Sequence, residues 1–279
     1  MTPPGESFLV VTPNLNMGRY LPATIESVLR NLRAGDEYAV IDGGSTDDSL
    51  DVLHAYGDRI SWWVSEQDGG YGEAIAKGLA RGRAELQCWV NAGDLLLEGA
   101  LDAARAHIAH TGADFIFGDD FHIDDTGRVL AFSRGYVPSL RDYMLFGGWT
   151  PLQDACFWRR RLYERVGGID TSMKFACDYD LFLRFSLRGR CVYVPVAFSA
   201  FRQHAGQKSI ARASDYERER QQCRQRALSA VRVAPVRRLW LEAWLSLQVR
   251  YRGHVLNPSW NLPGLVGTPI TSLSSRAYG

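Results

Sequence analysis

The sequence predicts an α/β protein whose mainly parallel sheet is flanked by helices, with a helical extension at the C-terminus. Short apolar runs alternate with helix-period segments between residues 8 and 110, which is the pattern of βαβ units. The first run, residues 8–12, is apolar throughout, as expected of a strand that is buried on both faces. From about residue 211 the chain becomes Arg-rich and helical in pattern.

The expected elements of the first half follow one another in a regular order. After the first strand, apolar residues recur at helical spacing at Leu21, Ile25, Val28, Leu29 and Leu32. Three more strands are expected at residues 37–41, 60–64 and 86–90. A helix is expected after each of these strands. The first carries Leu50 and Leu53, the second covers residues 71–81, and the third covers residues 100–110.

The pattern changes after Asp114. Residues 114–117 and 128–132 are expected to form a hairpin around the turn at residues 124–127. A helix is expected from Asp178 to about Arg188. We therefore expect a catalytic domain over residues 1–210 and a helical extension over residues 211–279, whose tail after Asn257 is loosely ordered.

Composition limits the class of protein. A net charge of +1 over 279 residues argues against a nucleic-acid partner, which requires clustered basic side chains. No run of 18 apolar residues is present, so no membrane-spanning helix is expected, and no signal peptide is visible. The five cysteines form no CxxC pair and are expected to be free thiols in a reducing compartment. These features predict a cytoplasmic protein.

Polar residues follow three of the expected strands, where ligands of open α/β sheets bind. They are Thr12-Pro13-Asn14, Asp42-Gly43-Gly44-Ser45 and Asn91-Ala92-Gly93-Asp94. A nucleotide explains the set, because one carboxylate can accept a hydrogen bond from a base and another can hold a divalent cation. Turn chemistry alone is the alternative explanation. The fingerprints of NAD-binding proteins and P-loop NTPases are absent.

Four segments together resemble glycosyltransferase family 2. They are residues 10–14, 40–47, 91–94 and 177–184, and Arg202-Gln203-His204 follows them. The resemblance covers roughly residues 7–210. It implies a GT-A (Rossmann-like) fold and inverting transfer of a sugar from a nucleotide-diphosphate donor, most commonly a UDP-sugar. It also implies a divalent metal, Mn²⁺ or Mg²⁺, and a hydroxyl acceptor.

The resemblance implies roles for single residues at the donor site. Thr12, Pro13, Asn14 and Asn91 would line the nucleotide pocket, and Asp42 would bind the base. Asp94 would hold the metal, with Gly93 in place of the family's preceding acidic residue. His204 would join the metal or the diphosphate. Asp68 and Lys77 would also line the nucleotide site, although a turn and a helix start explain this segment equally well.

The resemblance also implies roles at the acceptor face. Asp178 would be the catalytic base, with Cys177 in place of the family's Glu. The alternative for Asp178 is a plain helix N-cap. Helix geometry makes Asp180, two residues further along, point elsewhere, and we expect it to be a cap or a partner of Arg184 or Lys174. Trp149, Gln153 and Asp154 are expected to shape the sugar or acceptor site.

The Arg-rich C-terminal segment, with Trp240 and Trp244, favours a helix packed on the catalytic domain, and a helix at an anionic membrane surface is the alternative. The acceptor is expected to be a saccharide, free or lipid-linked, in bacterial polysaccharide or glycoconjugate biosynthesis. We would then expect the enzyme at the inner face of the cell membrane. Two other functions remain: a nucleotidyltransferase, and a catalytically idle sugar-nucleotide-binding protein, which Gly93 and Cys177 would permit.

Overall fold

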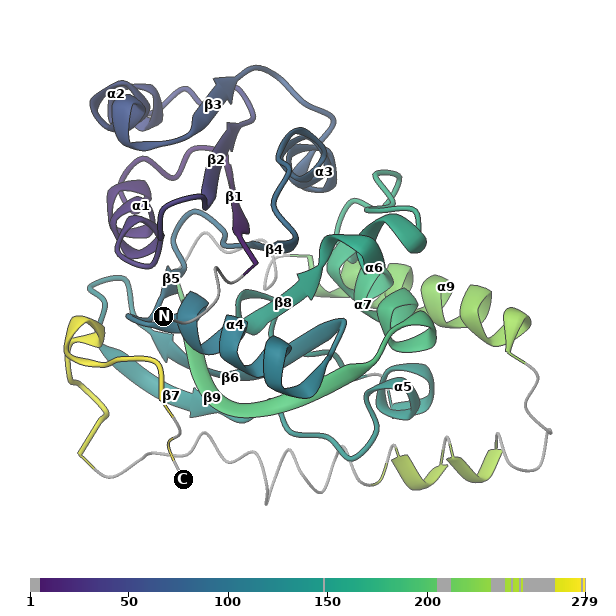
Figure 1. Ribbon diagram of the computed structural model, residues 1–279. Coiled ribbons are helices and arrows are strands. Elements are labelled where there is room, and N and C mark those ends of the chain that lie inside the picture. Colours follow the sequence, from purple (N-terminus) through teal and green to yellow (C-terminus); the bar gives the residue numbers. More distant parts are fainter. Residues whose placement is uncertain are drawn as a thin grey trace.

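The computed structural model describes residues 6–147, 149–204, 212–231, 239–241, 243–245, 247, 264–276 and 278. Within them, one curled sheet has the strand order β3-β2-β1-β4-β8-β6-β9-β5, and β7 pairs with β6 (Figure 1). The strands are β1 (Phe8–Asn14), β2 (Glu37–Asp42), β3 (Trp62–Ser65), β4 (Leu86–Trp89), β5 (Leu95–Leu96), β6 (Phe115–Ile123), β7 (Val129–Ser133), β8 (Cys156–Arg159) and β9 (Cys191–Arg202).

Helices cover this sheet, which confirms the predicted α/β class. The α-helices are α1 (Leu21–Leu29), α2 (Ser49–Tyr56), α3 (Tyr71–Arg81), α4 (Ala100–Thr111), α5 (Leu140–Asp142), α6 (Arg160–Arg165), α7 (Cys177–Arg188) and α9 (Ala213–Ala230). The shorter helical turns are η1 (Gly57–Arg59), η2 (Tyr143–Gly147), η3 (Gln153–Ala155) and η4 (Ile270–Ser272).

The first four strands, β3-β2-β1-β4, are all parallel. Their register places Asn14 opposite Asp42, and Asp42 opposite Ser65. Because parallel strands share one carboxyl edge, these three polar residues lie side by side. β3 begins two residues later than expected, because Gly57–Arg59 form a helical turn that Ile60 closes by donating its N–H to the Gly57 carbonyl at 3.3 Å.

The second half of the sheet is mixed. β8 runs antiparallel to β4 and β6, whereas β9 runs parallel to β6 and antiparallel to β5. The expected hairpin is present as β6 and β7, but its first strand continues to Ile123. β8 was not expected, because its four residues lie directly before α6 and carry no separate strand pattern.

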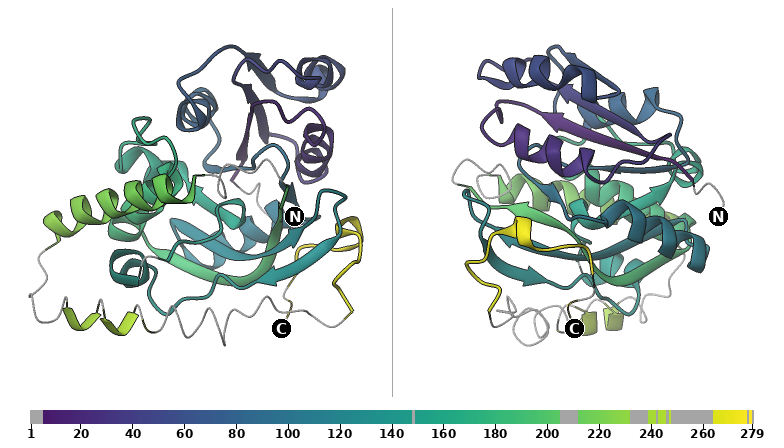
Figure 2. Two further views of the ribbon diagram at one scale, coloured as in Figure 1. Left: turned by 180° about the vertical axis from the view of Figure 1, so that it is seen from behind. Right: turned by 60° about the vertical axis from the view of Figure 1, so that its left-hand side comes forward.

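Both faces of the parallel strands are covered. α3 lies on one side of β1 and β2, and α1 and α2 lie on the other (Figures 1 and 2). Gly78 allows the close approach of α3, because a Cβ at this position would lie 2.4 Å from a methyl carbon of Val11. This packing fixes the amino end of α3 beside the carboxyl edge of the sheet.

The C-terminal extension packs on the catalytic part of the chain. α9 lies against α7, and its Cys223 is buried in the main core. Residues of the tail that we expected to be loosely ordered lie along the sheet instead. Val129 of β7 donates its N–H to Thr268, Ala197 of β9 donates to Arg276, and Ile270 is buried beneath (Figure 2). None of the described helices is both long and apolar enough to cross a bilayer.

Candidate active site at the carboxyl edge of the sheet

The ends of β1 and β2 form a hydrogen-bonded unit around the Asp42 carboxylate, which has no exposed surface. Asp42 Oδ1 accepts from Asn14 Nδ2 at 2.6 Å and from the Ser45 hydroxyl. Oδ2 accepts from the Ser65 hydroxyl at 2.6 Å and from the N–H groups of Ser45 and Gly44. Burial alone would raise the pKa of Asp42, but these hydrogen bonds outweigh burial and lower it. A direct contact with a base would require the loop to move.

The other two residues at the end of β1 are also buried. The Thr12 hydroxyl lies 3.1 Å from the Tyr38 hydroxyl in the core, so its side chain is buried within the protein. Pro13 accepts a hydrogen bond from the Ala92 N–H at 3.3 Å through its carbonyl. The end of β1 is therefore joined directly to the loop that carries Asp94, and mainly its backbone can line a pocket.

Asp68 lies beside the loop after β2. A Cβ built at Gly43 would lie 3.1 Å from Asp68 Oδ2, so the Asp68 carboxylate occupies the space into which a side chain at residue 43 would point. Lys77 on α3 pairs with Glu66 at 2.6 Å, and this hydrogen bond raises the pKa of Lys77. A contact between Lys77 and a diphosphate would require the lysine to exchange this partner.

The predicted nucleotide, metal and sugar residues meet at Asn91. Its Nδ2 donates to Asp94 Oδ2 at 3.0 Å and to Gln153 Oε1 at 2.9 Å, and its Oδ1 accepts from the Tyr71 hydroxyl at 2.7 Å. Gln153 also donates to the Trp89 carbonyl at 2.8 Å. Asn91 thus fixes the orientation of Asp94 and links it to Gln153 on the opposite segment.

The end of β9 is held on Asp94. The N–H of Arg202 donates to Asp94 Oδ1 at 2.9 Å, and its guanidinium donates to the Gly93 carbonyl at 2.8 Å. His204 follows two residues later and is half-buried, with its ring 5.6 Å from that of Tyr20. This brings the strand end that carries His204 to the loop that carries Asp94.

The missing acidic residue before Asp94 has a backbone explanation. Gly93 adopts φ +116°, which L side chains rarely adopt, and a Cβ there would lie 3.1 Å from Met17 Cε. This loop therefore favours glycine at residue 93 and presents one carboxylate, that of Asp94.

Two further carboxylates lie buried near Asp94. Asp154, a predicted sugar-site residue, and Asp120 of β6 have almost no exposed surface. Asp154 Oδ2 and both oxygens of Asp120 have no hydrogen-bond donor among the described residues. Burial raises the pKa of all three carboxyl groups, and the charge of Asp154 raises those of Asp94 and Asp120 further. Asp120 was not predicted, although two adjacent Asp residues inside an apolar strand were a usable signal.

The donor set fits a cation that keeps ligands of its own. Within the described residues, no three His, Cys, Asp or Glu side chains converge on a possible metal position. Mg²⁺ and similar hard cations commonly take one or two carboxylates and complete their shell with phosphate oxygens and water. Asp94, held by Arg202 and Asn91, suits such a site, because a cation would offset the cost of ionising a buried carboxyl group.

Asp178 is the second residue of α7 and is not its N-cap, which is Ala176. Its Oδ1 is buried and accepts no hydrogen bond from the described residues. Burial raises the pKa of Asp178 to about 6, Arg220 lowers it and Glu219 raises it. Asp180 behaves differently, as expected, because its Oδ2 binds the guanidinium of Arg184 at 2.6 and 2.8 Å.

Tyr71 connects the two predicted chemical groups. Burial raises the pKa of its hydroxyl well above the ordinary value, and the charges of Cys177, Asp178 and Asp94 raise it further. Asp178 and Asp94 therefore both act electrostatically on Tyr71, whose hydroxyl donates to Asn91. Sequence reasoning missed Tyr71, although it is the first residue of the expected third helix. Trp149, predicted for the acceptor site, is half-buried and packs against Phe117.

The sequence matches the family model described as glycosyl transferase family 2 over residues 9–167, more than half of the chain. A PGL/p-HBAD biosynthesis glycosyltransferase of Mycobacterium bovis is 27% identical over 207 residues, covering 71% of this chain and 78% of that protein. An uncharacterised glycosyltransferase of Mycobacterium tuberculosis is 31% identical over 185 residues, covering 64% and 68%.

Solved structures share the fold. S. aureus TarS 1–349 superposes with a TM-score of 0.65 at 17% identity, covering 89% of this chain and 72% of that one. Another TarS structure is covered over only 37% of its length. The mannosyltransferase PcManGT of Pyrobaculum calidifontis gives a TM-score of 0.60 at 14% identity, covering 90% and 76%. The fold is GT-A, and the chain belongs to glycosyl transferase family 2.

Proposed function

We propose that this chain is a metal-dependent, inverting glycosyltransferase that moves a sugar from a UDP-sugar donor to a hydroxyl group of a saccharide acceptor. The observation that carries the proposal is the buried Asp178 Oδ1, which has no hydrogen-bond donor among the described residues and shares Tyr71 as a neighbour with Asp94. One TarS structure holds UDP-GlcNAc, and the PcManGT structure holds GDP-Man and Mn²⁺, which supports a nucleotide-sugar donor here.

The chemistry assigned to Asp178 is general-base catalysis. The acceptor oxygen forms a bond to the anomeric carbon on the face opposite the diphosphate, whose glycosidic oxygen leaves with the bonding electron pair. The acceptor proton passes to Asp178 Oδ1. A pKa of about 6 leaves the carboxylate ionised at neutral pH and more basic than an exposed aspartate.

Asp94 and His204 would hold the Mn²⁺ or Mg²⁺ ion, which when bound offsets negative charge on the departing diphosphate. The nucleotide would lie on the backbone of residues 12–14 and 43–45, with Asp68 beside the loop after β2. Asn91 and Gln153 orient the Asp94 carboxylate toward the same centre.

A donor panel tests this function. UDP-, GDP- and TDP-sugars are incubated with the protein with and without Mn²⁺, and release of the nucleoside diphosphate is measured. We expect release from a UDP-sugar that depends on the metal. Binding without release, seen as a thermal shift by the same donors, would instead indicate an idle sugar-nucleotide-binding protein. Retention of configuration in the product, read by NMR, would contradict the inverting mechanism.

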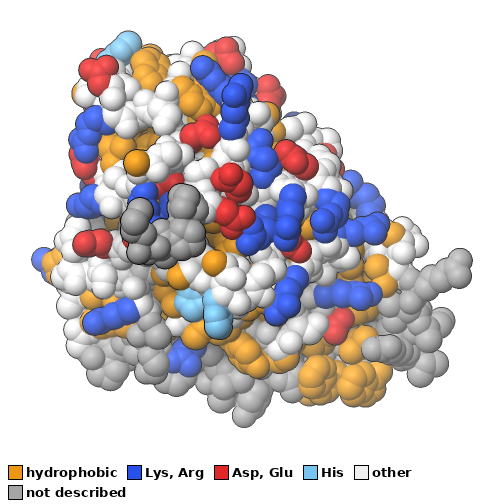
Figure 3. Space-filling model, in the orientation of Figure 1, with side chains coloured by type: hydrophobic (Ala, Val, Ile, Leu, Met, Phe, Trp, Pro, Cys, Tyr) orange, Lys and Arg blue, Asp and Glu red, His pale blue; other side chains and the backbone are white. Residues whose placement is uncertain are grey.

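We place the enzyme in bacterial polysaccharide or glycoconjugate biosynthesis, at the cytoplasmic face of the cell membrane. Four large apolar side chains of the C-terminal extension are exposed: Leu239, Trp240, Trp244 and Leu247. Figure 3 shows hydrophobic side chains gathered at the lower edge of one face. Sedimentation with phosphatidylglycerol vesicles should fall in the Trp240→Ala/Trp244→Ala variant. If wild type and the variant sediment equally with the vesicles, these side chains do not contact the membrane.

A further inference from the structure

The helix that carries Asp178 has no capping side chain of its own. The first N–H groups of an α-helix lack partners within the helix, and a Ser, Thr, Asp or Asn at the N-cap usually accepts from them. In α7 the N-cap is Ala176, which has no polar atom in its side chain. The Ala176 N–H at the N-cap therefore needs an acceptor from elsewhere, and so do the N–H groups of the loop residues that lead into the helix.

Glu219 of α9 supplies that acceptor. Its Oε1 accepts from the Lys174 N–H at 3.0 Å, and its Oε2 accepts from the Phe175 and Ala176 N–H groups, each at 2.9 Å. A carboxylate that accepts from backbone N–H groups forms charge-assisted hydrogen bonds, which are stronger than neutral ones. The chain directly before Asp178 is thus held at three consecutive residues by one side chain.

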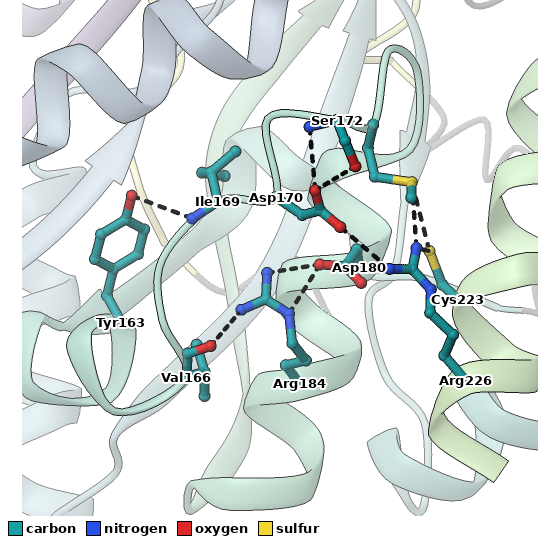
Figure 4. A network of polar contacts seen from close by, with 10 residues as sticks. Tyr163, Val166, Ile169, Asp170, Ser172, Asp180, Arg184, Cys223 and Arg226 are labelled. Atoms are coloured by element: carbon teal, nitrogen blue, oxygen red, sulfur yellow. Dashed lines mark hydrogen bonds and ion pairs between the residues drawn. The ribbon is translucent and has the colours of Figure 1, made fainter. Parts of the chain in front are cut away.

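A second set of contacts fixes α9 on the same segment. Arg226 pairs with Asp170 at 3.2 Å, and its guanidinium also contacts Met173 Sδ (Figure 4). The thiol of Cys223 lies 4.0 Å from the same sulfur. These contacts lie one turn or more along α9 from Glu219, so they set the position of the helix independently of the cap.

We propose that Glu219 is a positioning residue for the catalytic base, and that α9 thereby forms part of the active site. The inference rests on the proposed function of Asp178. By holding residues 174–176, Glu219 keeps the first turn of α7 in place, so that Asp178 Oδ1 keeps its position without a hydrogen-bond donor from the described residues. The match to the family model ends at residue 167, before both α7 and α9.

The cap also places a negative charge near the base. The titratable and charged groups that interact with Asp178 are Glu219, Arg220 and Tyr216 of α9, Tyr71 of α3, Cys156 of β8 and the adjacent Cys177. Glu219 raises the pKa of Asp178 and Arg220 lowers it. Neutralising Glu219 should therefore lower the pKa of the base, and the uncovered positive end of the α7 dipole acts in the same direction.

Hydrogen exchange tests the cap without any substrate. We compare Glu219→Gln and Glu219→Ala with Asp215→Asn, a control whose carboxylate pairs with Arg212 and Arg218 at the start of α9. Amides 174–176 should exchange at least about tenfold faster in both Glu219 variants and at the wild-type rate in the control, since about 1.4 kcal/mol of lost protection gives that factor. Unchanged exchange would overturn the proposal.

Turnover tests the positioning role. Release of UDP is followed against pH with UDP-GlcNAc first, and then with the donor that the panel identifies. For Glu219→Gln we expect kcat to fall about tenfold or more and KM to change little. The acidic limb of the profile of kcat against pH should lie at lower pH than in wild type. If amides 174–176 exchange faster in the variant while its kcat and the acidic limb of its pH profile equal those of wild type, Glu219 is purely structural and the proposal is overturned. If wild type releases no nucleotide from any donor, the proposed function fails, while the exchange result on the cap still stands.

Discussion

Asp42 at the end of β2 and Asp178 at the start of α7 have opposite environments, although both carboxyl groups are removed from bulk solvent. Asp42 accepts five hydrogen bonds, which hold its pKa below the ordinary value. Asp178 has a buried oxygen without a donor, and burial raises its pKa to about 6. The donors around Asp42 outweigh the effect of burial on its pKa, whereas at Asp178 the effect of burial prevails.

This difference assigns different roles to two aspartates that the sequence places in the same predicted site. A carboxylate whose acceptor sites are all used shapes the protein around it, as Asp42 does with the loop at residues 43–45. A buried carboxylate with an unused acceptor site costs stability and is retained where it can meet a proton or a cation. Asp154 and Asp120 belong to this second group, whereas Asp180 forms an ion pair with Arg184.

The largest expected effect is on turnover in Asp178→Asn. The amide keeps the size of the side chain but cannot take the acceptor proton, so kcat should fall about a hundredfold or more. Binding of the nucleotide should barely change, because the base acts on the acceptor face. Turnover is measured as product formed from the acceptor, or as the slow hydrolysis of the donor with water as acceptor.

Asp180→Asn is the matched control on the same helix. Its carboxylate binds the guanidinium of Arg184, so the variant should lose stability while keeping most of its turnover. If Asp180→Asn were inactive and Asp178→Asn active, our assignment of the base would be wrong by two residues, and Asp180 would be the base. If both were active, Asp154 would be the next candidate for the base.

The next effect concerns the metal. Asp94→Asn should abolish Mn²⁺-dependent binding of UDP, because this loop presents one carboxylate only. Calorimetry with UDP, with and without Mn²⁺, measures the difference directly. An Mn²⁺-dependent affinity equal to that of wild type would remove Asp94 from the metal site and direct attention to Asp154 and Asp120.

Much of the fold could be predicted from local patterns. The parallel strands β1 to β4 are short apolar runs, and α1 and α3 show one apolar face each, so periodicity identified them. β8 and the two-residue β5 could not be found in this way, because their partners lie far away in sequence. The packing of Ile270 and Tyr278 on the second hydrophobic cluster depends on similarly distant contacts.

The site was predictable only as a set of motifs. Asp42, Asn91, Asp94 and Asp178 stand at strand or helix ends, where a sequence pattern can place them. Some of the donors that these carboxylates meet are distant in sequence: Asp42 accepts from Ser65 at the end of β3, and Asp94 accepts from Arg202 at the end of β9. The capping of α7 by Glu219 joins residues more than 40 positions apart, and no local signal announces it.

A smaller effect is expected on stability at neutral pH. Asp42→Asn should lower the free energy of unfolding by about 1–3 kcal/mol, because an amide leaves part of the donor set around residue 42 unsatisfied. Asp178→Asn should leave stability unchanged or raise it, since it removes a charge that burial disfavours. Urea unfolding measures both. Equal destabilisation by the two variants would erase the distinction between them.

The smallest effect is the pH dependence of that stability in the metal-free protein. The folded pKa of Asp42 lies below the unfolded value of about 3.9, so its contribution is present above that pH and is lost as the pH falls through the folded value. The folded pKa of Asp178 is raised to about 6, so between pH 4 and 6 the native state keeps a proton that the unfolded chain has lost, and stability falls as the pH rises. The deficit of Asp42→Asn should therefore shrink below about pH 4, while any advantage of Asp178→Asn should grow from pH 4 to 6 and then level off. Urea titrations at closely spaced pH values separate the two windows.

A gain in Asp178→Asn that stayed constant across pH 4 to 6 would show that Asp178 ionises normally in the folded protein, and the contrast with Asp42 would then rest on geometry alone.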